Sequence, residues 1–208
     1  MEKKVLEKLV YGLFVLTARM DDYDNGCIIN TAQQVAFNPD IICIAVNKSS
    51  YTHDMILATG TFNISVISEQ ADFALFQRFG YQTGREADKF NGFTAWKRSD
   101  NGITYITQGT NAYISAKVIH YVSTNTHTIF MARIEEEGHI SGEPSATYDF
   151  YQQKIKQPVE VQPKTEPEGK IVWVCKICGY VYEGEELPED FVCPICKHPA
   201  ADFEKVIN

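Results

Sequence analysis

Two closely spaced pairs of cysteines near the carboxyl end constrain this chain more than any other feature. Cys175 and Cys178 form one C-x-x-C pair and Cys193 and Cys196 form the second, with 14 residues between the pairs. Four thiolates at this spacing can bind one tetrahedral metal ion. A unit of about 35 residues needs such a metal because its apolar core is small. The sequence therefore predicts a small metal-stabilised domain, and the spacing alone leaves zinc and iron open.

The composition of the whole chain argues against some partners and compartments. The 208 residues carry a formal net charge of −8, which disfavours nucleic acid and anionic membranes as the main partner. No stretch has the roughly 18 apolar residues of a transmembrane helix, and the first 20 residues lack a signal-peptide cleavage site. Cys27 and Cys43 lie singly in hydrophobic runs, which favours a reducing compartment over a disulfide scaffold. We therefore expect a cytoplasmic protein.

The chain divides after Tyr151, where its composition changes. The following segment contains Pro158, Pro163 and Pro167, alternating charges and no aromatic residue. Such a segment buries too little apolar area to offset the entropy of ordering. We predict one domain over residues 1–151, a linker over residues 152–169 and the metal domain over residues 170–208.

The first domain is expected to be mainly β. Runs rich in Val, Ile, Thr and aromatic residues predict strands at 11–18, 26–37, 40–48, 61–67, 111–122 and 127–137. One helix is expected from Ser50 or Thr52 to Gly60 and another over residues 71–80, and Asn25-Gly26 predicts a hairpin turn. Six or more strands with two short helices indicate a closed or nearly closed antiparallel barrel. No G-x-G-x-x-G motif follows a strand, so a Rossmann site is not expected.

The surroundings of the cysteines resemble rubredoxin. V-C-x-x-C-G-Y-V-Y is followed by L-P-x-D-F-V-C-P-x-C, with a shorter segment between the pairs than in most rubredoxins and closer to the rubrerythrin modules. The resemblance implies one iron ion bound by all four cysteines, an FeCys4 centre that carries single electrons. It also implies that Cys178 and Cys196 lie nearest the surface, where the electron leaves.

Two polar stretches of the first domain are candidates for a cofactor site. One lies where a strand meets a helix and offers a cation, hydroxyls and helix N–H groups, which together suit a phosphate. The other breaks the alternation of a strand and suggests a polar groove. The first comprises Asn47, Lys48, Ser50, Thr52 and His53, and the second Asn30, Thr31, Gln33 and Gln34. Taken alone, a first stretch of this kind is usually just a capped, solvated helix start. Outward-facing strand residues are the alternative for the second stretch, although its broken alternation favours the groove.

The order of motifs from about Leu9 to Tyr148 resembles the flavin reductase-like split barrels that bind FMN. The matching segments are N-G-C-x-x-N-T, V-x-K-S-S-Y-T-H, G-T-F-x-I-S-V-I, F-G and D-K-F. The resemblance implies that Asn30, Thr31, Gln33 and Gln34 border the isoalloxazine ring, and that Lys48, Ser50, Thr52 and His53 hold the phosphate. It further implies that Phe79, Gly80 and Lys89 lie near the flavin. His127 is the candidate catalytic residue, and the alternative is that it is only a surface histidine on a strand.

The two resemblances together predict an electron relay. A flavin accepts electron pairs and releases single electrons, and an FeCys4 centre carries one. We expect an electron-transfer flavoprotein–rubredoxin, similar to high-molecular-weight rubredoxins, that takes electrons from NAD(P)H, directly or through a reductase. They would pass through FMN to iron and on to a flavodiiron oxygen or nitric oxide reductase or a rubrerythrin-like protein. The resemblance also implies a homodimer.

Three alternatives remain at this point. The chain could be an NAD(P)H:flavin reductase that releases reduced flavin, or a non-catalytic flavin-binding protein with a structural zinc clip. An FMN oxidase of the pyridoxamine-phosphate type is disfavoured because the sequence offers no second phosphate pocket.

Overall fold

The computed structural model describes residues 5–156, 171–175, 180–193 and 199–207. The first domain is built on one seven-stranded antiparallel sheet with the order β2-β1-β5-β8-β9-β4-β3. The strands are β1 (Phe14–Met20), β2 (Tyr23–Ile29), β3 (Ala32–Ala36), β4 (Ile41–Asn47), β5 (Thr61–Ile67), β8 (Thr110–Ser123) and β9 (His127–His139). The prediction of a mainly β split barrel is confirmed.

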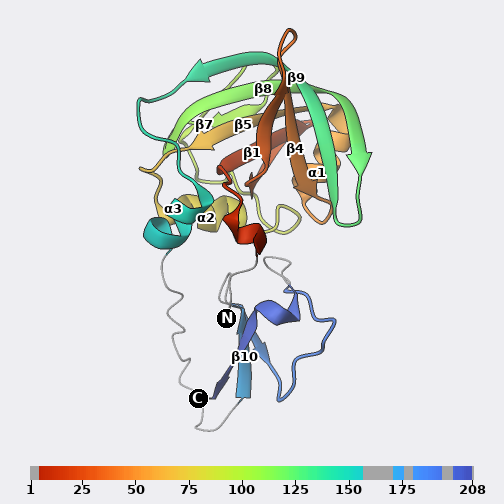
Figure 1. The fold of residues 1–208 in the computed structure, drawn as a ribbon, viewed down its shortest axis with the longest axis vertical. Helices are drawn as coiled ribbons and strands as arrows, with labels where there is room; N and C mark the ends of the chain where they lie inside the picture. Colours follow the sequence, from red (N-terminus) through yellow and green to blue (C-terminus); the bar gives the residue numbers. More distant parts are fainter. Residues whose placement is uncertain (1–4, 157–170, 176–179, 194–198, 208) are drawn as a thin grey trace.

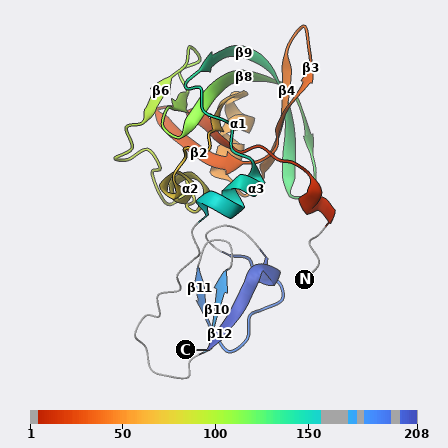
Figure 2. The same ribbon diagram turned by 60° about the vertical axis from the view of Figure 1, so that its left-hand side comes forward.

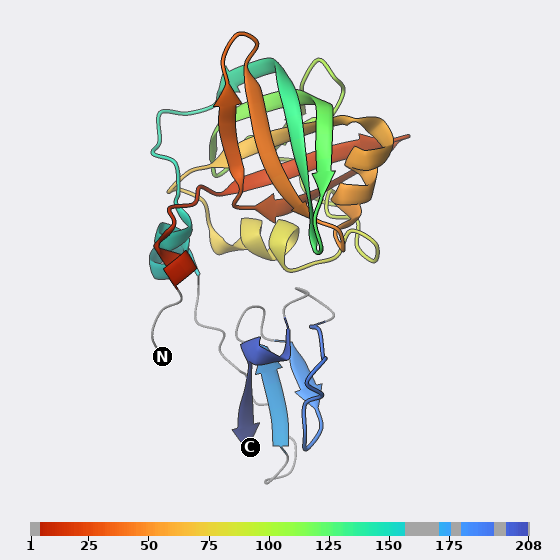
Figure 3. The same cartoon turned by 45° about the vertical axis from the view of Figure 1, so that its right-hand side comes forward.

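The sheet is strongly curved. Strands β2 and β3 are the outermost strands, yet only Asn30 and Thr31 separate them in the chain. Three Cα–Cα steps span at most about 11 Å, so the end of β2 must lie close to the start of β3, which the curvature of the sheet in Figures 1 and 3 allows. The single strand expected over residues 26–37 is therefore two strands on opposite edges.

The hairpin between β1 and β2 turns earlier than expected. Its loop is Asp21-Asp22, with Asp21 at a φ of 53°, whereas Asn25 and Gly26 lie inside β2, opposite Ala18 and Thr17. The prediction of a turn at Asn25-Gly26 was wrong. Gly26 suits the close packing there instead, because a Cβ would lie 3.0 Å from the Leu16 carbonyl oxygen and 3.2 Å from the Phe79 ring.

Helix α1 (Tyr51–Thr59) closes one end of the barrel (Figure 1). Ser50 is its N-cap residue and Gly60, at a φ of 70°, ends it, as the sequence predicts. Met55 and Ile56 project from the helix into the main core. Their partners on the strands include Leu16, Ile44, Phe62 and Phe130.

A second core lies between helix α2 (Phe73–Gly80) and the end of the barrel domain. It includes the segment made of α3 (Tyr148–Phe150) and η2 (Tyr151–Ile155), which lies beside α2 in Figures 1 and 2. The predicted boundary between residues 151 and 152 falls inside this segment, because Tyr151 and Ile155 are buried. The remaining elements are η1 (Val5–Lys8) and the short hairpin β6 (Trp96–Arg98)–β7 (Thr104–Ile106).

The C-terminal domain contains a three-stranded sheet of order β11-β10-β12. Its elements are β10 (Ile171–Cys175), β11 (Val181–Glu183), η3 (Ala200–Asp202) and β12 (Phe203–Ile207). Its small core joins Cys175, Cys193 and Phe203. Over the described ranges of the whole chain, no helix has the length and apolar character needed to cross a membrane.

Candidate functional site

A cavity of about 560 Å³ opens at the connection between the edge strands β2 and β3, and we call it the barrel pocket. It is bordered by the β2–β3 connection, the start of α1, the end of α2 and the α3–η2 segment. The lining residues are Leu13, Cys27, Ile28, Ile29, Asn30, Thr31, Ala45, Val46, Asn47, Ser49, Ser50, Tyr51, Phe76, Phe79, Gly80, Tyr81, Gln82, Thr83, Gly84, Lys89, Thr126, His127, Tyr148, Tyr151, Gln152, Lys156 and Pro199.

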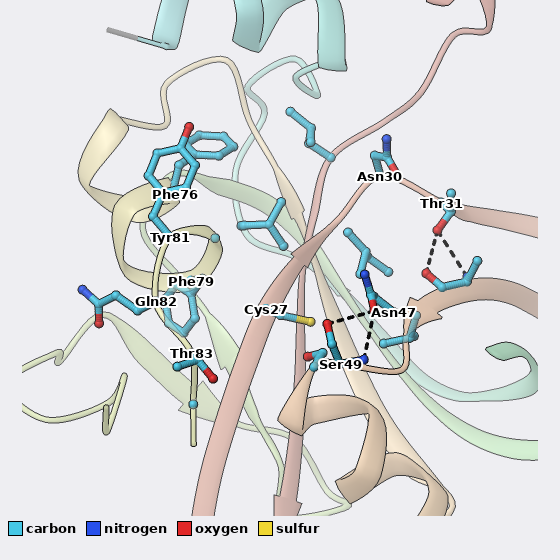
Figure 4. A pocket seen from close by; sticks show the side chains of 18 of the residues that line it. Cys27, Asn30, Thr31, Asn47, Ser49, Phe76, Phe79, Tyr81, Gln82 and Thr83 are labelled. Atoms are coloured by element: carbon cyan, nitrogen blue, oxygen red, sulfur yellow. Dashed lines mark hydrogen bonds between the residues drawn. The ribbon is translucent and has the colours of Figure 1, made fainter. Parts of the chain in front are cut away.

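The two sides of the pocket differ in chemistry (Figure 4). One side presents the amide and hydroxyl side chains of Asn30, Thr31, Asn47 and Ser49. The other presents aromatic rings from α2 and the residues that follow it, among them Phe76 and Tyr81. Such a pocket suits a planar aromatic ligand with a polar edge, and its volume is in the range of cofactor sites.

The polar side ends at the N-terminus of α1. Asn47 accepts hydrogen bonds at Oδ1 from the Ser49 backbone N–H and the Ser49 hydroxyl, both at 2.9 Å. This turn fixes the chain between β4 and α1 and leaves Ser50 at the pocket wall. The first N–H groups of a helix have no intrahelical acceptor and carry partial positive charge. This end of the pocket therefore suits an anionic group such as a phosphate.

Lys89 places a buried ammonium group in the wall of the pocket. Its side chain donates to the carbonyl oxygens of Gly26 at 2.8 Å and Phe79 at 3.1 Å, and the residue is 3% exposed. Burial lowers the pKa of Lys89 below its ordinary value, an effect that nearby Cys27 opposes. A cation in this position can stabilise negative charge on a bound ligand.

His127 lies at the rim of the same pocket. It begins β9 opposite Asn47 on β4, so the sheet register brings it to the helix N-terminus described above. Its Nδ1 atom is 2.8 Å from the Thr126 hydroxyl, which leaves Nε2 as the atom available to a ligand.

The structure separates the predicted cofactor residues into two groups. Asn30, Thr31, Asn47, Ser50, Phe79, Gly80, Lys89 and His127 line the pocket. Gln33, Gln34, Lys48, Thr52 and His53 are not among its lining residues.

Each residue of the second group has another place in the fold. Gln33 and Gln34 are exposed on the edge strand β3, and Lys48 donates to the carbonyl of Thr124. Thr52 is buried and accepts from Asn25 at 3.1 Å. His53 is buried as well, 2.8 Å from the Thr128 hydroxyl and behind the pocket wall.

Sequence reasoning missed the aromatic side of the pocket. Phe76, Tyr81, Tyr148 and Tyr151 all line it, and Tyr148 and Tyr151 come from the end of the barrel domain. The aromatic run T-Y-D-F-Y before the proline-rich segment was the signal that could have indicated a packed helical turn there.

The second candidate site is the metal centre of the C-terminal domain. Cys175 and Cys193 are fully buried in its core and share it with Phe203. Cys178 and Cys196 lie outside the described residues, so within those residues no group of three metal-binding side chains is assembled. Two buried thiols, each opening a C-x-x-C pair, fit a tetrahedral thiolate site.

Comparison with known proteins assigns a family to each domain. The flavin reductase like domain matches residues 6–158, and the rubrerythrin, rubredoxin-like domain matches residues 173–204. The high molecular weight rubredoxin of Moorella thermoacetica is 34% identical over 99% of this chain and 100% of its own length. The ferric-chelate reductase (NAD(P)H) of Archaeoglobus fulgidus is 29% identical over 73% of this chain and 89% of its own.

The solved structures support the fold of the barrel. The NADH:FAD oxidoreductase SgcE6 of Streptomyces globisporus superposes with a TM-score of 0.61 at 20% identity, covering 69% of this chain and 84% of that one. The family matches imply a flavin in the barrel and iron in the C-terminal domain, and the chemistry of both sites fits these groups. The chain therefore belongs to the flavin reductase-like family and carries a C-terminal rubredoxin-like domain, which makes it an oxidoreductase of the electron-transfer type.

Proposed function

We propose that this protein relays electrons from NAD(P)H through FMN in the barrel pocket to an FeCys4 centre in the C-terminal domain. The observation that carries the proposal is one chain with two sites: a pocket with an aromatic side and an anion-binding helix end, and a core with two buried cysteines. Bound FMN would supply the step from hydride to single electrons, and a one-iron centre accepts them singly.

The residues of the barrel pocket have distinct roles in this proposal. The aromatic side holds the ring system, and the amides of Asn30 and Asn47 bond its polar edge. Thr31 fixes the wall of the pocket there, because its hydroxyl donates to the Ala45 carbonyl at 2.9 Å and accepts from the Ala45 N–H at 3.2 Å. The N-terminus of α1 with Ser50 holds the phosphate, which favours FMN. Lys89 stabilises negative charge on the reduced ring, and His127 positions the donor at the rim.

The partners follow from the same chemistry. The donor is NAD(P)H, directly or through a reductase, and the acceptor is a one-electron redox protein such as a flavodiiron reductase or a rubrerythrin-like protein. We further propose that the protein is cytoplasmic and forms a homodimer, because large apolar side chains are exposed on the edge strand β3, on the β3–β4 connection and toward the end of the central strand β8. They include Val35, Phe37, Ile119, Tyr121 and Val122.

Anaerobically purified protein provides the test. We expect flavin and iron in about equal amounts, and bleaching of both absorption spectra on titration with NADH or NADPH. If neither nucleotide reacts, photoreduction of the flavin tests the internal step and a separate reductase becomes the donor. Reduced flavin beside iron that stays oxidised would refute the relay, and bound zinc in place of iron would favour the structural clip.

A further inference from the structure

The α3–η2 segment is both a wall of the barrel pocket and the end of the barrel. Tyr148, Tyr151 and Lys156 line the pocket. Lys156 is also the last residue described before residues 157–170, which make up most of the predicted linker. The chain therefore leaves the barrel at the rim of the pocket and not at a distant face.

Tyr151 fixes this segment. Its ring stacks on Phe76 with centroids 4.3 Å apart, and its hydroxyl is hydrogen-bonded to that of Tyr81. Tyr151 is 6% exposed, and one turn later Ile155 joins the same core. A buried aromatic stack of this kind is worth about 1 kcal/mol beyond its area. Side-chain packing against α2 therefore stabilises this segment, which is too short to be stable as an isolated helix.

Two observations indicate what lies at the rim. Pro199, which belongs to the C-terminal domain, is one of the residues that line the pocket. Pro199 also forms a β-bridge with Val192, the residue directly before the buried Cys193. The part of the C-terminal domain found at the pocket is therefore its metal-binding end.

From these contacts, and resting on the function proposed above, we infer that the pocket rim is the docking surface for the C-terminal domain of the same chain. The α3–η2 segment is the fixed base of the tether, and Tyr151 is its positioning residue. Only 14 residues separate Lys156 from Ile171, and a tether of this kind gives a local concentration of order millimolar. The C-terminal domain would then accept electrons from the flavin bound in the barrel of the same chain.

With both cofactors bound, the redox step would balance between them, an external acceptor and solvent. Each transfer would move one electron from the reduced flavin to the iron, which would go from ferric to ferrous. A second transfer would follow once an external one-electron acceptor had reoxidised the iron, and the protons lost on complete flavin oxidation would pass to solvent at the rim.

The kinetic test uses full-length protein with both cofactors and flash photoreduction of the flavin. The rate of iron reduction should not change with protein concentration. Inserting a further 14 Gly/Ser residues after Pro163 should slow it about threefold, because local concentration falls with about the −3/2 power of tether length. Tyr151→Ala should slow it as well, and Tyr151→Phe, which keeps the stack, should slow it less. A rate proportional to protein concentration, or one unaffected by the insertion, would overturn the inference.

Amide hydrogen exchange of the same proteins supplies a readout that needs no electron transfer. Tyr151→Ala should speed exchange in residues 148–155, and the linker insertion should speed it in the rim residues 80–84 while leaving the barrel strands unchanged. Tyr113→Ala is the matched control, since it also removes a stacked and hydrogen-bonded tyrosine ring, here one that stacks on Tyr105 with centroids 3.9 Å apart and donates to Glu136 at 2.6 Å. If the linker insertion leaves amide exchange at the rim unchanged, docking is refuted. If the rim of the wild-type protein is protected but its iron is not reduced, the relay is refuted and docking stands.

Discussion

Lys89 shows how one buried side chain can join distant parts of the pocket. Its ammonium group bridges the carbonyl of Gly26 on β2 and that of Phe79 at the end of α2. The sequence, through the family resemblance, pointed to Lys89 as a pocket residue. The sequence could not predict which groups accept from Lys89, because these residues lie 63 and 10 positions away in the chain. In addition, every residue has a backbone carbonyl, so residue type does not indicate which carbonyl accepts.

We expect Lys89→Met to destabilise the barrel by about 1–3 kcal/mol, because two buried carbonyls lose their donor. The pKa of Lys89 is lowered in the folded state, so between that value and 10.5 the unfolded chain binds more protons and wild-type stability rises with pH. The stability difference between wild type and variant should therefore widen from neutral pH toward about pH 10.

Urea unfolding followed by far-ultraviolet circular dichroism, at several pH values in that range, measures this difference. A difference that narrows as the pH rises would mean that the folded protein holds the Lys89 proton more tightly than the unfolded chain, contrary to the burial of its ammonium group.

At the scale of elements, the sequence predicted the long strands and both main helices because their patterns are local. Helix α1 begins after Ser50 and ends at Gly60, and these two capping residues are recognisable in the sequence. The prediction failed where tertiary packing decided the backbone. Asn25-Gly26 has turn chemistry, yet both residues pair inside β2, where a Cβ on Gly26 would be crowded by Leu16, Thr17 and Phe79. The β6–β7 hairpin has three-residue strands, too short for a visible alternation.

The turn between β4 and α1 gives a prediction about ligand binding. Asn47→Ala removes two hydrogen bonds that shape the helix N-terminus, together worth about 1–2 kcal/mol, and it also removes the amide that we propose bonds the polar edge of the flavin. We expect the Kd for FMN to rise roughly five- to thirtyfold, measured by fluorescence titration of flavin-depleted protein.

Thr59→Ala is the control for this effect. It also removes a hydrogen bond from α1, 2.8 Å to the carbonyl of Met55, but at the end of the helix away from the barrel pocket. If Thr59→Ala weakens FMN binding as much as Asn47→Ala, the cause is general helix stability and not the shape of the N-terminus.

For the whole molecule, the two sites differ in how far the sequence could predict them. All four cysteines of the metal site lie within about 20 residues of sequence, so their spacing and the residues that flank them identify the site directly. The barrel pocket is assembled from seven separate stretches of chain between Leu13 and Lys156, together with Pro199. Residue types suggested its polar side, whereas its aromatic side depends on the packing of the α3–η2 segment against α2. The predicted linker began inside that segment for the same reason.

The separation of the two sites leads to a last prediction, on metal loss. Cys175 is fully buried in the core of the C-terminal domain, and a domain of this size depends on its metal for folding. Cys175→Ser should abolish iron binding and unfold the C-terminal domain, which is observed as loss of protection from amide exchange in β10 and β12.

The barrel should keep its flavin with an unchanged Kd, because none of the residues that shape the helix end or the aromatic side belongs to that domain. Cys43→Ser, which alters a barrel cysteine outside the pocket lining, should leave both cofactors bound. Loss of flavin in Cys175→Ser alone would show that the barrel pocket depends on the C-terminal domain for its structure, and not only for the removal of electrons.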